Sequence, residues 1–85
     1  MKKIDLKELA DTLHSAFIAT GVALIDVGED PDYDLVVNLT SGGFGCALLA
    51  HGYTVEEIKE VTDTAKAQLL TGVKEFAYRH ALEKL

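Results

Sequence analysis

Apolar residues in the first part of the chain recur every three or four positions, the spacing that places them on one face of an amphipathic helix. They are Leu6, Leu9, Ala10, Leu13, Ala16 and Phe17. Asp5 and Glu8 stand three residues apart, as an N-cap and its reciprocating carboxylate do. We therefore expect a helix that begins after Asp5 and ends near Gly21, because glycine commonly terminates helices.

Two short apolar runs, partly β-branched, follow at residues 22–27 and 35–39, and the segment between them holds the only proline. Such runs on either side of a turn predict an antiparallel β-hairpin. The alternative is a buried helix, since Leu35, Leu39, Gly43, Cys46 and Ala50 share one helical face. Glycines at positions 42, 43 and 45 oppose that helix, each by roughly 1 kcal/mol relative to alanine. The strands are therefore the favoured interpretation.

The C-terminal part of the chain carries a well-defined helix start. Thr54 and Glu57 form the S/T-x-x-E pattern of a capping box, and only Gly72 interrupts the helix formers that follow. The apolar face of this helix consists of Ile58, Val61, Ala65, Leu69, Val73, Phe76 and His80 or Ala81.

These elements predict one α+β domain over residues 1–85. Its order is an N-terminal helix, a β-hairpin, a glycine-rich loop with a short element at residues 46–50, and a long C-terminal helix packed across the sheet. The short element is a helix or a third strand and ends at Gly52. The alternative architecture is an all-α helical bundle.

Charge is distributed unevenly along the chain. No Lys or Arg occurs from Glu8 to Ile58, although this window carries nine carboxylates. They are Glu8, Asp11, Asp26, Glu29, Asp30, Asp32, Asp34, Glu56 and Glu57. Because cations supply most of the affinity for phosphates, this distribution argues against a nucleic-acid partner and equally against an anionic membrane surface. A lone cysteine and short apolar runs predict a cytoplasmic protein.

One local segment has the composition of a ligand loop, since glycines let backbone N–H groups approach an anion closely. It consists of Thr40, Ser41, Gly42, Gly43, Phe44 and Gly45. Both established phosphate motifs are incomplete there, because Leu48 replaces the third glycine of one and the other lacks its Gly-Lys-Ser/Thr. A turn without a ligand is the favoured interpretation, and contact with a nucleotide or another small molecule is the alternative.

Other chemistry is incomplete as well. Cys46 has no base at a helical spacing, because His51 lies on a different face, so a buried structural cysteine is expected. Asp30, Asp32 and Asp34 open like a calcium loop, but the glycine and the final glutamate of that loop are missing. The histidines share no zinc-ligand spacing. The sequence therefore predicts no catalytic residue, no metal and no cofactor.

The remaining hypothesis is a small acidic, non-catalytic binding or regulatory protein that acts as a homo-oligomer. A continuous helix from residue 54 to 85 would be about 48 Å long and would extend past its own domain, where its apolar face needs a cover. Tyrosine and arginine are common in interface hot spots. The predicted interface consists of Tyr53, Leu69, Val73, Phe76, Tyr78 and Arg79.

An interaction or inhibitor module with a basic protein partner is the form we favour, and compact acidic proteins of this size are often encoded by phages and accessory elements. A small-ligand sponge or sensor that uses the glycine-rich segment is the first alternative. A cysteine-dependent enzyme is the second.

The charge distribution leads to a direct prediction. The protein should show no binding to random duplex DNA at about 0.15 M salt, because the central window offers phosphates no cation. Fluorescence anisotropy with a labelled duplex measures this. A sub-micromolar complex would contradict the prediction and would point to a cationic face built from Lys59, Lys66, Lys74 and Arg79.

Overall fold

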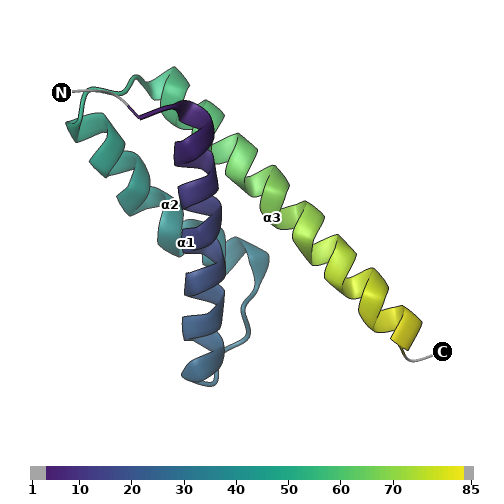
Figure 1. Cartoon of the computed structure of the whole chain (residues 1–85). Helices are drawn as coiled ribbons and strands as arrows, with labels where there is room; N and C mark the ends of the chain where they lie inside the picture. Colours follow the sequence, from purple (N-terminus) through teal and green to yellow (C-terminus); the bar gives the residue numbers. More distant parts are fainter. Residues whose placement is uncertain (1–3, 84–85) are drawn as a thin grey trace.

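The computed structural model describes residues 4–83, with side chains given for residues 4–72, and it contains three α-helices. They are α1 (Leu6–Asp26), α2 (Tyr33–Ala50) and α3 (Val55–Glu83). The chain descends along α1, returns along α2 and descends again along α3 (Figure 1). No strand occurs in the described range, so the predicted α+β fold is wrong and the helical bundle that stood as its alternative is the observed architecture.

The predicted β-hairpin fails because each of its apolar runs belongs to a helix. Residues 22–26 are the last turn and a half of α1, and residues 33–39 are the first two turns of α2. Gly21 does not end α1; Gly28 does, with a φ of 82° that only glycine adopts easily. The N–H of Glu29 donates to the carbonyl of Leu24 at 2.9 Å and that of Gly28 to Ile25 at 3.0 Å, which is a Schellman motif.

The end of α2 repeats this arrangement. Gly52 has a φ of 90°, and its N–H donates to the carbonyl of Leu49 at 3.2 Å. Tyr53 donates its N–H to Leu48 at 3.1 Å, and both of these side chains are buried. This second Schellman motif ends α2 and places Tyr53, the residue after Gly52, in the core. The prediction that Gly52 ends the preceding element is therefore confirmed.

The core lies where the three helices meet. Its buried apolar residues are Leu9, Ala10, Leu13, Phe17, Val36, Val37, Leu48, Tyr53, Val61, Ala65 and Leu69. The face of α2 that enters it carries Val36, Val37 and Leu48, whereas Leu35 and Leu39 of the predicted helical face are exposed. Burial of this other face offsets the helix cost of the glycines. Gly45 also contributes, because a Cβ there would stand 3.5 Å from Ile58 of α3.

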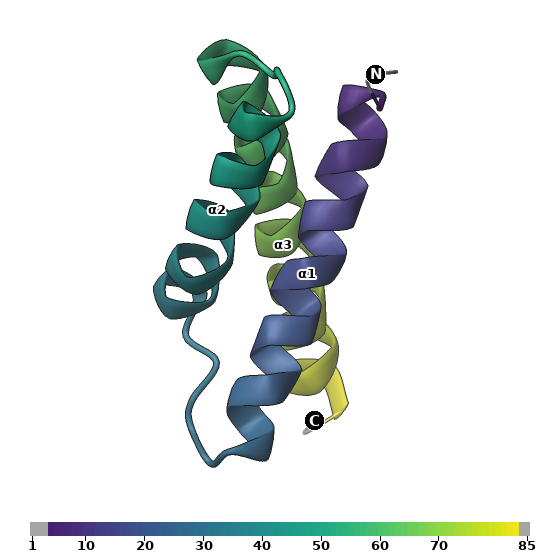
Figure 2. The same cartoon turned by 90° about the vertical axis from the view of Figure 1, so that its left-hand side faces the viewer.

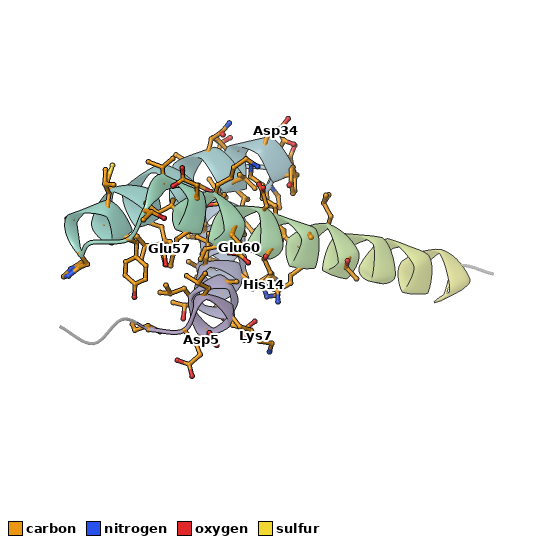
Figure 3. All side chains as sticks on the ribbon, turned by 90° about the horizontal axis from the view of Figure 1, so that it is seen from above. Asp5, Lys7, His14, Asp34, Glu57 and Glu60 are labelled. Atoms are coloured by element: carbon orange, nitrogen blue, oxygen red, sulfur yellow. The ribbon has the colours of Figure 1, made fainter. Side chains whose placement is uncertain are left out.

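The start of α3 confirms the capping box. The N–H of Thr54 donates to Oε1 of Glu57 at 2.9 Å, and the N–H of Glu57 donates to Oγ1 of Thr54 at 3.1 Å. The helix then continues through Gly72 without a break. The chain consequently measures 52 × 25 × 17 Å, with a radius of gyration of 14.5 Å, against about 12 Å for a compact chain of this length. Figure 3 shows α3 extending beyond both other helices.

Some glycines of this chain are needed for a positive φ and others lie inside a helix, where they lower its stability. A matched pair of variants tests this difference. Gly28→Ala should lower the free energy of unfolding by about 1–2 kcal/mol, because alanine resists a positive φ. Gly43→Ala should raise it by about 0.5–1 kcal/mol, because Gly43 lies inside α2 with no atom near its missing Cβ. Urea unfolding at one protein concentration measures both. Equal effects of the two substitutions would contradict the assignment.

Candidate functional site

Several of the exposed large apolar side chains lie on the C-terminal half of α1 and on the turn that follows it. Ile18, Val22 and Ile25 are 51%, 53% and 59% exposed, and they stand on one face of the helix at i, i+4 and i+7. No residue from Ser15 to Ile25 is charged. This half of α1 is therefore apolar on both its buried and its exposed sides.

These exposed side chains border an apolar groove of about 310 Å³. Its lining consists of Phe17, Ile18, Gly21, Val22, Ile25, Pro31, Tyr33, Val36 and Leu69. None of these residues is charged, and the volume lies at the lower end of the range of small-ligand pockets, about 300–1,000 Å³. The groove accepts apolar groups and offers few polar partners.

The groove exists because α3 leaves the other two helices. Among the described side chains of α3, Leu69 is the last one in the core and the one that lines the groove. Beyond it α3 continues straight and diverges from α1 (Figure 1), and Figure 2 shows α1 and α2 side by side with α3 behind them. The C-terminal half of α1 is thus left without the third helix that covers its N-terminal half.

One rim of the groove is strongly acidic. The segment that joins α1 to α2, with the helix ends on either side, carries five exposed carboxylates. They are Asp26, Glu29, Asp30, Asp32 and Asp34, and they are called the acidic loop below. Pro31 and Tyr33 of the same segment line the groove itself. Figure 3 shows Asp34 at the start of α2, away from the other labelled charges.

A pair of threonines holds the two walls of this region together. The hydroxyls of Thr20 in α1 and Thr40 in α2 are 2.8 Å apart. Each hydroxyl also lies within hydrogen-bond distance of the carbonyl four residues earlier, Ala16 at 2.9 Å and Val36 at 2.8 Å. Two protons serve these three contacts, so not all three are hydrogen bonds at the same time. When one hydroxyl donates to the other, the pair forms a hydrogen bond between α1 and α2.

The structure places the predicted ligand segment inside α2. Its backbone N–H groups belong to the interior of a helix, so the expected loop of free amides is wrong. Thr40 binds Thr20, Phe44 packs against the core and Gly45 lies against Ile58. Gly42 and Gly43 are exposed. The oxygen of Ser41 is buried and has no hydrogen-bond partner. Contact of these six residues with a ligand stays a prediction.

The predicted interface residues fall into two groups. Tyr53 is buried, and its hydroxyl accepts a 2.7 Å hydrogen bond from the N–H of Ile4. Its contacts therefore lie within the chain. Leu69 lines the groove. The remaining predictions, Val73, Phe76, Tyr78 and Arg79, have side chains that lie outside the described ones.

Reactive and charged groups lie elsewhere on the surface. Cys46 is exposed, so the expectation of a buried cysteine is wrong. The apolar face of α2 that enters the core does not include it.

Among the described residues no group of three or more His, Cys, Asp or Glu side chains is arranged to hold a metal ion. A 2.7 Å hydrogen bond between Lys59 and Asp63 raises the pKa of the lysine and lowers that of the aspartate, on the solvent side of α3.

One helix bears on the predicted location of the protein. Of the described helices, α1 alone is long and apolar enough to meet the length and composition criteria of a membrane span. Core helices of soluble proteins meet the same criteria, and α1 buries Leu9, Ala10, Leu13 and Phe17 in the core. The cytoplasmic location stays a prediction.

Comparison with known proteins adds nothing to this description, because no protein-family model, no curated protein and no solved structure matches the chain.

Sequence reasoning missed the groove. Its signal is the stretch from Ala16 to Ile25, in which only Thr20 is polar and which exceeds what one face of a helix needs. The expected helix end at Gly21 assigns this stretch to a helix and a strand, and neither element alone has an excess of apolar residues.

Two neighbouring hydroxyls in α2 provide a test of the site's internal bonding. Ser41→Ala should raise the free energy of unfolding by about 1 kcal/mol, because it removes a buried oxygen without a partner. Thr40→Val should lower it by about 1 kcal/mol, because it leaves Thr20 without its partner across the helices. Thermal unfolding followed by circular dichroism measures both. A stabilising Thr40→Val would show that the threonine pair does not join α1 to α2.

Proposed function

We propose that this protein is a small, non-catalytic interaction module that works as a homo-oligomer. The observation that supports it is the exposed apolar surface around the groove, where Ile18, Val22 and Ile25 are each more than half exposed. Single apolar residues are ordinary on protein surfaces, but a contiguous patch marks a site of contact with another molecule.

Chain length supports the same proposal. A chain of 85 residues buries only about 60% or slightly more of its unfolded surface, so its single core supplies little stability. In this protein the side chains of Ile18, Val22 and Ile25 stay outside that core. Association that covers the groove would bury this surface and would stabilise the fold by mass action.

The site has the composition of a contact surface rather than of a catalytic centre. Catalysis needs a nucleophile or acid–base pair with an orienting partner, and the groove offers only the phenol of Tyr33 as a titratable group. Cys46 and His51 are exposed but do not line it. A nucleotide-like ligand has less support, because the lining provides no cation for phosphate and the acidic loop repels it. The same loop favours a partner of basic charge.

The oligomeric state tests this proposal directly. Wild-type protein at tens of micromolar should sediment at a multiple of its 9.2 kDa monomer mass and should dissociate on dilution. Ile18→Glu should shift this equilibrium toward monomer by about tenfold or more, because it places a charge in the patch. Val55→Glu, which changes a residue that is 68% exposed at the start of α3, should leave the mass unchanged. A wild-type monomer throughout this range would end the proposal.

A further inference from the structure

The groove lies where a third helix could pack against α1 and α2. The helix α3 packs against α1 and α2 as far as Leu69 and then leads away from α1 (Figure 1), and the groove lies beside the part of α1 that α3 leaves. From Ile18 to Ile25 this space is about 10 Å long at the rise of a helix. Apolar grooves of this kind accept the apolar face of an amphipathic helix through anchors spaced at i, i+3, i+4 and i+7.

The segment that could fill it is present in the chain. After Gly72, α3 continues for eleven residues to Glu83, or about 16 Å, which is enough to span the groove. Its sequence places apolar residues at i, i+3, i+4 and i+8. They are Val73, Phe76, Ala77 and Ala81. This spacing continues the face that Val61, Ala65 and Leu69 present to the core.

Charge affects how the same segment would be oriented. The acidic loop on the rim of the groove carries five carboxylates, and no Lys or Arg occurs from Glu8 to Ile58. The end of α3 supplies Lys74 and Arg79 together with Glu75 and Glu83, so its net charge is zero and only its two cations are complementary to the loop. Opposite charges at the border of an apolar contact fix its orientation.

The end of α3 does not reach the groove of its own chain. The helix is continuous from Val55 to Glu83 and leads away from α1, so occupation within one chain would require α3 to break at Gly72. A second copy presents the same segment without any break. In a two-fold pair each copy would supply its α3 end to the other, which makes the contact reciprocal and closed.

We infer that the groove between α1 and α2 is the docking site for the C-terminal end of α3, residues 73–83, from a second copy of the chain. This inference rests on the proposed homo-oligomer and names the surface and the segment through which it forms. The apolar anchors fill the groove, and the cations of the segment lie beside the acidic loop.

Cross-linking between two singly substituted full-length proteins tests the docking. Both carry Cys46→Ala, since Cys46 is exposed. One also carries Val22→Cys in the groove and the other Phe76→Cys in α3, with Val73→Cys as a second choice if Phe76→Cys abolishes association. Mixed under mild oxidation, they should form the disulfide between unlike chains at least about tenfold faster than a pair in which Leu49→Cys replaces Val22→Cys. Leu49 is 57% exposed on α2 and lies outside the groove.

The outcomes separate this inference from the proposed function. If the wild-type protein is oligomeric but the Val22→Cys pair reacts no faster than the Leu49→Cys pair, the homo-oligomer stands and the docking of α3 is overturned. If Val22→Cys and Phe76→Cys placed together in one chain form an intrachain disulfide at a rate independent of concentration, α3 folds back on itself and the inference is also overturned. A monomeric wild-type protein would contradict both the proposed homo-oligomer and the docking of α3.

Substitutions that reverse the charges on the two surfaces test the docking independently of the cross-linking. Lys74→Glu with Arg79→Glu should weaken association by about tenfold or more at low salt, because both substitutions place like charges beside the acidic loop. Adding Asp30→Lys and Asp32→Lys to the same chain should restore it. Restoration supports the docking, since substitutions that merely damage α3 would not be rescued by the loop. Failure of the rescue, with all variants folded by circular dichroism, overturns it.

Discussion

The contact between α1 and α3 is the interaction on which the rest of this structure depends. These two helices share more contacts than any other pair, and the most deeply buried large side chains, Leu13, Phe17 and Val61, all lie on them. Ala65, fully buried and small, lets the two helices approach closely. The helix α2 completes the core with three buried side chains but contributes less to holding α1 and α3 in place.

The direction of α3 after this contact determines the surface of the molecule. Because α3 is straight and crosses α1 instead of following it, the contact ends at Leu69 and the lower half of α1 keeps an apolar exterior. The acidic loop limits what can approach that exterior, since it favours cations and repels phosphates and anionic surfaces. Apolar surface and negative charge are therefore neighbours on this side of the molecule, and any contact made there would meet both.

The start of α1 after Asp5, the end of α2 at Gly52 and the capping box of α3 could be predicted because local chemistry determines them. Thr54 and Glu57 bind one another wherever the helix packs. The middle of the chain could not be predicted in this way. Gly21 reads as a terminator, yet tertiary contacts carry α1 past it to Gly28, and the glycines of α2 are tolerated because Val36, Val37 and Leu48 are buried. The groove depends on where α3 separates from α1, which is a property of three helices together and of no local pattern.

The order of the helices has a consequence for synthesis on the ribosome. The main contact of the fold joins the first helix to the last, so a nascent chain that has completed α1 and α2 still lacks Val61, Ala65 and Leu69. Until those residues leave the exit tunnel, the apolar side chains of α1 have only the smaller α2 contact to cover them. The apolar side chains of α1 are thus covered in full only after Leu69 has emerged, so this fold is completed late relative to the synthesis of its first helix.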